Sequence, residues 1–376
     1  MKTTSNNPVI LNGILFLFIL YLVNLIVKNK RNGSLIESLQ FYHKDFKPFY
    51  KQNNIKYNSK NKEFMYKKNT ISKSILNSKN SIYIMNNKGR TNYFLKKNNI
   101  PVPNELIFNK ETYNNKQTGI EEIIKVVNNK LNYPVVIKPT NQQNSIDVFI
   151  NIKNDYELKN KLKQLFKKYD ELIVQEFIKG NLYRILIINN KIIDVLLRPL
   201  PFVIGNGKNT LQELIDIKNN QQIKEGNYPT KELNIKFIKS QGFTISNNNI
   251  IPKDKYIYLT NIPTYHNGSN PERINIDIIH KDNIILFLNT LKILDASIVG
   301  IDFISTDISK SYKNNNRNNN RNNNRNNNVD KNTSKIIEIN SGPDYIFHKN
   351  IKPTKNIANL IAMEVKHILD KRILKP

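Results

Sequence analysis

From about Ile82 onward, short apolar runs alternate with longer segments of helical period. The runs "YPVVIKP" and "ELIVQEF" predict strands, "DYELKNKLKQLFKKY" predicts a helix, and "YRILIINNKIIDVLLR" predicts a hairpin that turns at the Asn-Asn pair 189–190. Thr210, with Glu213 three places later, has the pattern of a capping box. Asp282 is expected to cap the helix in "DNIILFLNTLKIL". The chain is therefore predicted to have an α+β fold.

Two of the C-terminal apolar runs contain a carboxylate. In "IIEINSGPDYIFH", Glu338 and Asn340 point to one side of a strand, because alternate strand residues face the same way. In "SIVGIDFIS" the interrupting acid is Asp302. If these strands pair as an antiparallel hairpin, three oxygen donors converge, and such a set without His or Cys suits Mg²⁺ completed by phosphate oxygens. The sequence therefore predicts a magnesium site that binds a polyphosphate.

Lys138 is a candidate ligand for such a phosphate. It follows the apolar run "VVI", and Pro139 ends the strand directly after it. A Lys at the end of a buried strand is costly without an anion, although a surface Lys with a buried stem would look the same. Further on, the strand in "IVQEFIKG" leads into a linker where the backbone from Gln175 to Ile178 can face an adenine edge.

The N-terminal segment resembles a membrane anchor. Residues 9–27 contain no charge, and 19 residues is close to the roughly 20 that cross a bilayer. The segment "KNKRNGS" follows in place of a small-residue cleavage site, so residues 1–28 are expected to be an uncleaved anchor. Positive charge after the segment exceeds that before it, which predicts a single-pass protein with its body in the cytoplasm. The alternative is an apolar helix buried in a core.

The rest of the chain divides by composition. Residues 29–81 are polar and rich in Lys, Asn and Ser, which predicts a linker or loosely structured lead-in. Residues 82–370 form the folded domain. Within it, residues 313–328 read "KNNNRNNNRNNNRNNN", which cannot bury apolar area and is expected to be a disordered insertion.

Charge and cysteine content exclude some classes of function. The chain has no Cys, so it has no disulfide, thiolate metal site or Cys nucleophile. The net charge of +28 suggests a binder of nucleic acid or of another anionic surface. The positive charge is scattered and accompanies an excess of Asn and Ile, which share A/T-rich codons with Lys. We therefore interpret it as coding bias on a solvated surface, so that nucleic acid is not the expected partner.

The order of motifs resembles the ATP-grasp superfamily. The motifs are "KGRT", "NNIPVPNE", "YPVVIKP", "LIVQEFIKGNLYRILII", "RPLPFVIGNGKNTLQELI", "IVGIDFI" and "IIEINSGPDYIFH", and they span about residues 82–370. Within the superfamily, the chain is most similar to the ligase domain of cyanophycin synthetase and to the glutathione synthetase module of the bifunctional glutathione enzyme. The resemblance implies two α+β subdomains that clasp ATP between them.

The resemblance also implies roles for individual residues. Lys88 and Lys138 match lysines that bind the ATP phosphates. The hinge segment that binds adenine in the family matches Gln175, Glu176 and Ile178. One or two Mg²⁺ ions, or Mn²⁺, would be held by three residues: Asp302, Glu338 and Asn340.

Four further residues match positions near the reacting groups. Arg184 and Arg198 match arginines that line the acyl-phosphate region, although each is equally consistent with a surface ion pair. Lys208 lies in the "GNGKNT" turn typical of this branch and is expected to contact the nucleotide. His348 matches a family histidine, and capping of a turn is the alternative.

The implied activity is ATP- and Mg²⁺-dependent formation of an amide or peptide bond through an acyl phosphate. The substrates would be a small-molecule or peptide carboxylate and an amine. Two departures leave an alternative open. The loop after Lys138, "PTNQQNSIDVFI", lacks the glycines of the family, and Asn181-Leu182 replaces an acidic residue expected at the ribose. A degenerate ATP-binding scaffold is therefore the second hypothesis, and an anionic-surface binder is the third.

Overall fold

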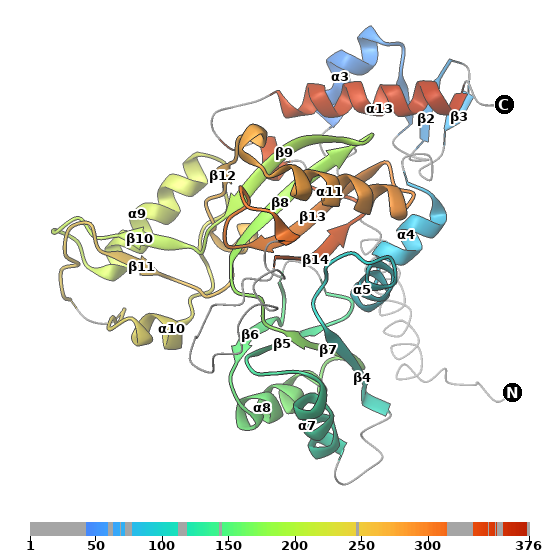
Figure 1. Ribbon diagram of the computed structural model, residues 1–376. Helices are drawn as coiled ribbons and strands as arrows, with labels where there is room; N and C mark the ends of the chain where they lie inside the picture. Colours follow the sequence, from blue (N-terminus) through green and yellow to red (C-terminus); the bar gives the residue numbers. More distant parts are fainter. Residues whose placement is uncertain are drawn as a thin grey trace, which may run out of the picture.

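The computed structural model describes residues 43–58, 63–67, 69–71, 77–111, 119–142, 145–245, 248–313, 334–344, 346–349, 351 and 356–373. Two sheets of four and five strands form the body of the protein, and a smaller unit lies at one side of the larger sheet (Figure 1). The predicted α+β fold is confirmed.

The four-stranded sheet is antiparallel, with strand order β4-β7-β5-β6. Helices α7 and α8 cover its outer face (Figure 1), because Ile123 and Val127 of α7 and Leu158 and Leu162 of α8 recur at helical spacing and are fully buried. The predicted strands in "YPVVIKP" and "ELIVQEF" and the predicted helix all form here. The elements are β4 (Glu105–Asn109), α7 (Gly119–Lys130), β5 (Val135–Pro139), β6 (Phe149–Ile152), α8 (Asp155–Leu165) and β7 (Glu171–Glu176).

The five-stranded sheet has the order β12-β9-β8-β13-β14, and its neighbouring strands are antiparallel. The predicted hairpin is confirmed, since β8 and β9 are joined at Asn189 and Asn190, which adopt φ of 49° and 61°. Asn tolerates this left-handed conformation better than most residues. The strands are β8 (Asn181–Ile188), β9 (Lys191–Arg198), β12 (Glu272–Arg273), β13 (Ile298–Ser305) and β14 (Lys335–Asn340).

The two faces of this larger sheet have different neighbours. Ile185 and Ile187 of β8 share one core with α11, whereas Leu186 and Ile188 share the other with α13. Arg184 precedes Leu186 by two residues, so it lies on the α13 face of the sheet but beyond the apolar core. The helices around this sheet are α4 (Lys79–Met85), α5 (Lys88–Lys97), α11 (Lys281–Ile293), α12 (Ile346–Lys349) and α13 (Ile357–Ile373).

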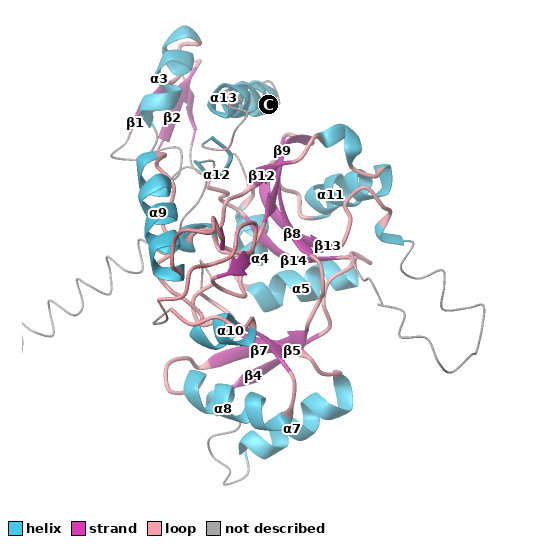
Figure 2. Cartoon of the chain, turned by 90° about the vertical axis from the view of Figure 1, so that its left-hand side faces the viewer, coloured by secondary structure: helices cyan, strands magenta, loops and turns pink. Residues whose placement is uncertain are grey.

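The two sheets lie one above the other in both views, and α5 lies at the level between them (Figures 1 and 2). The smaller unit extends from the C-terminal end of β9 and has its own apolar core. Its capping box is confirmed, because the Thr210 side chain and the Glu213 side chain each accept from the other's backbone N–H. Its elements are β10 (Phe202–Ile204), α9 (Leu211–Lys224), α10 (Ile235–Ser240), β11 (Tyr256–Tyr258) and η2 (Tyr265–Asn267). The short helix η3 (Ile276–Ile278) follows β12 and packs on the core of the larger sheet.

The lead-in differs from the predicted polar linker. Phe46 and Tyr50, one helical turn apart, are buried in the same core as Ile361 and Val365 of α13. The aromatic residues of "FYHKDFKPFY" thus give this polar segment an apolar stripe, and α3 lies along α13 (Figure 1). The elements are α3 (His43–Gln52), β1 (Lys56–Asn58), β2 (Glu63–Tyr66) and β3 (Asn69–Ile71).

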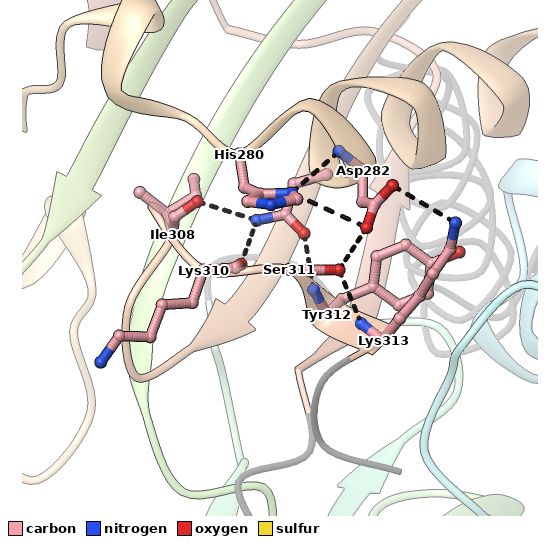
Figure 3. Close-up of polar contacts among 8 residues, drawn as sticks. His280, Asp282, Ile308, Lys310, Ser311, Tyr312 and Lys313 are labelled. Atoms are coloured by element: carbon pink, nitrogen blue, oxygen red, sulfur yellow. Dashed lines mark hydrogen bonds and ion pairs between the residues drawn. The ribbon is translucent and has the colours of Figure 1, made fainter. Parts of the chain in front are cut away.

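The predicted cap of α11 is wrong by two residues. The N-cap is His280, whose Nδ1 accepts from the backbone N–H of Asp282 at 3.1 Å. The Asp282 carboxylate instead accepts from the Ser311 hydroxyl and lies 3.3 Å from Lys313 Nζ (Figure 3). The segment after β13 is thereby attached to the start of α11. Apart from Lys313, the Asn/Arg segment 313–328 lies outside the described residues.

The structure gives no support to a membrane-spanning segment within its described ranges, where none of the helices combines the length and apolarity needed to cross a bilayer. The predicted anchor, residues 9–27, lies outside those ranges, so it stays a prediction.

Candidate active site

The predicted oxygen donors share one face of the larger sheet. Strands β13 and β14 pair antiparallel, with Asp302 opposite Glu338 and Gly300 opposite Asn340. Directly opposed residues and alternate residues along a strand face the same way, so Asp302, Glu338 and Asn340 lie on one face. A register shift follows immediately, between Asp302 and Phe303, and such irregularities re-aim the side chains next to them. The predicted pairing is confirmed.

Both predicted arginines bind Asp302. Arg184 lies directly across β8 from Asp302, and its Nη1 is 2.7 Å from Asp302 Oδ1. Arg198 on β9 places Nη1 3.3 Å from Asp302 Oδ2. The three side chains are 8%, 10% and 11% exposed, so the alternative of surface ion pairs is wrong. Burial lowers the pKa of Arg198, and Asp302 opposes that shift.

Gly300 makes room for this pair. A Cβ atom at residue 300 would lie 3.0 Å from Arg184 Cζ and 3.0 Å from Pro343 Cβ, closer than ordinary contact on both sides. The glycine in "IVGIDFI" is therefore a packing requirement of the Arg184 guanidinium.

Two lysines approach Glu338 from outside the sheet that carries it. Lys88, at the start of α5, places Nζ 3.3 Å from Glu338 Oε1 and donates at 2.6 Å to the carbonyl of Gln142. Lys138, on β5 of the smaller sheet, is only 6% exposed. Burial and then Lys88 lower the pKa of Lys138, while Glu338, Glu105 and Asp302 raise it. The two lysines that were predicted to bind phosphate thus meet Glu338 and Asp302, which were predicted to bind metal, between the two sheets.

The predicted adenine hinge lies at the end of β7. Gln175 is 5% exposed, and its Oε1 is a buried acceptor for which the described residues supply no hydrogen-bond partner. Glu176 accepts from the backbone N–H of Asn104 at 3.0 Å and from Lys335 Nζ of β14. Ile178 is buried beyond them. A strand of the first sheet is therefore linked to a strand of the second at this hinge.

Glu105, on β4, is a site residue that the sequence does not reveal. It lies opposite Gln175 across the β4–β7 pair. Burial raises its pKa to about 7, although Lys138 and Lys96 lower it. The sequence did not predict a role for Glu105, because it is a single acid at the start of β4 and its neighbour Lys138 comes from another strand.

Lys208 and His348 have other partners, although His348 lies near enough to Arg184 for that guanidinium to lower its pKa. Lys208 is exposed in the turn before α9, where its backbone N–H donates to Asn206 Oδ1 at 3.0 Å. His348 is fully buried, with Nδ1 3.1 Å from Asp194 Oδ2. Arg273 Nε lies 2.9 Å from Asp194 Oδ1 on the same carboxylate. The predicted nucleotide contact of Lys208 stays a prediction.

Asp194 was not predicted either, although its sequence pattern could have indicated it. It interrupts the apolar strand "KIIDVLLR" in the same way that Asp302 interrupts "IVGIDFIS". Burial alone would raise the pKa of Asp194, but His348 and Arg273 hold it below its usual value. Burial lowers the pKa of His348, opposed by Asp194.

The glycine-free loop after Lys138 forms with non-glycine residues in unusual conformations. Ser145 and Asp147 adopt φ of 58° and 54°, which glycine would adopt without strain. The Asp147 carboxylate accepts from Tyr169 at 2.6 Å and from Lys168 at 3.1 Å. These contacts hold Asp147, at the described end of the loop, against the segment before β7.

The donor set fits a hard divalent ion. Within the described ranges, no group of three His, Cys, Asp or Glu side chains is placed to hold a metal. An ion here would therefore be bound by the carboxylates of Asp302 and Glu338, the amide of Asn340, water and ligand oxygens. That composition is typical of Mg²⁺, which seldom occupies an all-protein cage.

Comparisons of the sequence with known proteins show what the chain is similar to. Residues 94–199 match the family model "D-ala D-ala ligase C-terminus". Cyanophycin synthetase of Synechocystis sp. is 28% identical over 66% of this chain and 27% of its own length. A glutathione biosynthesis bifunctional protein of Clostridium perfringens is 29% identical over 62% of this chain and 30% of its own length. The chain thus spans less than a third of these curated relatives.

Among solved structures, the bifunctional glutathione synthetase from Pasteurella multocida superposes with a TM-score of 0.52 at 20% sequence identity. The match covers 84% of this chain and 41% of that one. This likeness confirms the fold.

Proposed function

We propose that this chain, which belongs to the ATP-grasp superfamily, is an ATP- and Mg²⁺-dependent ligase that joins a carboxylate to an amine. One observation carries the proposal: Lys88 and Lys138 meet Glu338 and Asp302 between the two sheets. A nucleotide bound between the sheets would need phosphate ligands, here from α5 and β5, opposite metal ligands from β13 and β14. The similarity to two kinds of ligase supports the same conclusion.

The residues fall into three groups by what they would hold. Lys88 and Lys138 would bind the phosphates, and Gln175 with its buried acceptor, together with Glu176 and Ile178, would bind adenine. When bound between Asp302, Glu338 and Asn340, Mg²⁺ would neutralise charge that develops on the phosphoryl oxygens. Lys88 and Arg184 pair with Glu338 and Asp302 and hold these carboxylates in place.

Arg184 and Arg198 would bind the acid substrate and its acyl phosphate. In this reaction, the γ-phosphoryl group moves from ATP to the carboxylate, and the amine then displaces phosphate. The protein needs to supply orientation and positive charge, and no side-chain nucleophile is required. The two guanidinium groups lie side by side on the sheet, where little solvent competes for an anion.

Calorimetric titration of Mg-ATP into the full chain tests the nucleotide site. Saturable binding that requires Mg²⁺ and is lost in Lys138→Ala and Glu338→Gln is expected. ADP release that requires an acid and an amine together, from panels of amino acids and dipeptides, would establish the ligase. ADP release that Lys138→Ala leaves unchanged would refute it.

The second candidate is an ATP-binding scaffold, which the loop after Lys138 favours. Ser145 and Asp147 take positions that suit glycine, and Asp147 is bound to Tyr169 and Lys168. A fixed loop of this kind can cover phosphates without opening for turnover. Mg-ATP binding without ADP release from any acid would support the scaffold, and any acid-dependent turnover would exclude it.

A further inference from the structure

The short 3-10 helix η2 places His266 at the arginine end of the candidate active site. Tyr265, its neighbour, is 1% exposed and packs on Leu196 of β9, two residues before Arg198. The Ser269 hydroxyl, just after η2, donates to the Pro199 carbonyl at 2.7 Å, so both ends of η2 are fixed beside the end of β9.

Several contacts hold η2 rigidly. Lys218 Nζ, on α9, donates to the Gly268 carbonyl at 2.9 Å. Gly268 adopts φ of 83°, and a Cβ there would lie 1.9 Å from Thr230 Oγ1. Asn267 Oδ1 accepts backbone N–H groups of residues 231 and 232 at 2.8 and 2.9 Å. The His266 ring stands edge-on to Tyr228, with ring centroids 4.6 Å apart. A side chain with so little freedom has a defined direction.

The groups that face His266 keep it neutral. Burial lowers its pKa below 6.5, and the guanidinium groups of Arg198 and Arg184 lower it further. Asp344, after β14, opposes this shift. The rings of Tyr228 and Tyr265 pack against the imidazole. At neutral pH the imidazole is therefore a proton acceptor next to the two arginines that would hold the acyl phosphate.

We propose that His266 accepts the proton that the amine substrate loses, an inference that rests on the proposed ligase function. As the C–N bond forms, the C–O bond to phosphate breaks and phosphate leaves with the bonding electron pair. An ammonium nitrogen loses two protons on becoming an amide: the second goes to the departing phosphate, and the first, lost before the attack, goes to the imidazole. The imidazolium then returns that proton to solvent. An amino acid or peptide amine, which is an ammonium ion at neutral pH, needs such an acceptor.

Hydroxylamine separates the two halves of the reaction, because it is already unprotonated at neutral pH and traps acyl phosphates as hydroxamates. Each of the twenty amino acids, free and as dipeptides, serves as the acid. With His266→Gln, the amine-dependent rate is expected to fall about 100-fold to 10,000-fold. Hydroxamate formation should stay within a few-fold of wild type. The amine rate of the variant should rise with the free-amine fraction, whereas the wild-type rate should decline only below the pKa of His266.

His280→Asn is the matched control. His280 is also partly buried, but its ring caps α11 by accepting from the backbone N–H of Asp282 (Figure 3), and Asn can cap in its place. Both rates should be unchanged in this variant. Equal losses of both rates in His266→Gln, or no loss in either, would overturn the inference while leaving the ligase established. Absence of hydroxamate with every acid would overturn the proposed function itself.

A titration of ¹⁵N-labelled histidine adds a readout that needs no substrate. The signal that disappears in His266→Gln should titrate with a midpoint below the ordinary 6.5. A titration midpoint above 7 would leave His266 protonated at neutral pH and would also overturn the inference.

Discussion

Asp194 and Asp302 lie on the same sheet and begin from the same pattern, one carboxylate in an apolar strand, yet their surroundings differ. Asp194 is fully buried and closed in by Arg273 at 2.9 Å and by His348 at 3.1 Å. Asp302 also pairs with arginines, but the residue opposite it is Glu338, which is 27% exposed. The difference shows that a buried acid becomes an anchor or a site according to what the neighbouring strands place beside it.

The anchor should carry the larger share of stability. Asp194→Asn is expected to lower the free energy of unfolding by about 3–5 kcal/mol, because it leaves the Arg273 guanidinium buried without its counter-charge. Arg273 also donates to the carbonyls of His348 and Ile351, so the segment after β14 should loosen as well. Urea denaturation measures the change.

Asp302→Asn is the matched variant for this prediction. Its loss should be smaller, because Asp302 and its two arginines are 8–11% exposed, whereas Arg273 and Asp194 are 4% and 0% exposed, so water can partly solvate the arginines that lose their carboxylate. Equal losses from the two variants would show that both carboxylates are anchors, and the comparison would fail.

For stabilisation by added nucleotide, Asp302 should matter more than Asp194. Saturating Mg-ATP, at about 100 times its dissociation constant, should stabilise the wild type by about 2.7 kcal/mol. Asp302→Asn and Lys138→Ala should lose this increment, whereas Asp194→Asn should keep it. Thermal unfolding with and without Mg-ATP gives the increment, with Mg²⁺ alone as the control. An increment lost in all three variants would mean that Asp194 also shapes the site.

Glu105 tests a third setting, a half-buried acid that faces Lys138. Its pKa is about 7 when folded and about 4.5 when unfolded, so the stability it contributes is present below pH 4.5 and is lost as the pH rises through 7. Glu105→Gln cannot ionise and is expected to stabilise the chain by about 1–3 kcal/mol at pH 8, with no gain at pH 4.5. Denaturation at both pH values checks this against exposed Glu111→Gln. A gain in stability that does not depend on pH would show that ionisation of Glu105 is not its cause.

Local pattern was enough for much of the site. Alternation within two strands predicted that Glu338 and Asn340 share a face and that Asp302 lies beside them, and the register agrees. The Asn-Asn turn was equally visible, because few residues adopt its backbone conformation. These features depend on residues close in sequence or on the fixed geometry of paired strands.

Features that depend on tertiary packing were not predictable in this way. The stripe of Phe46 and Tyr50 was misread as linker because its partner helix, α13, lies some 300 residues later. Asp282 did not become the N-cap because Ser311 and Lys313 occupy its carboxylate. Likewise, Asp194 becomes an anchor only because β12 delivers Arg273 to it.

The smallest effect is expected where the Asn/Arg segment interrupts the hairpin that carries Asp302 and Glu338. The chain on either side is fixed without it: Ser334 Oγ donates to Ser305 Oγ at 2.9 Å, and Lys313 lies 3.3 Å from Asp282. Excision of residues 316–331 shortens the connection between Ser305 and Ser334 from 28 residues to 12, which should stabilise the chain by no more than about 0.8 kcal/mol. Mg-ATP affinity should not change. The β8–β9 hairpin, with its two-residue turn, shows that this sheet needs no long connection between paired strands. Weaker Mg-ATP binding after the excision would mean that the segment supports the Asp302 site. The difference between Asp302 and Asp194 would then not be explained by their neighbouring strands alone.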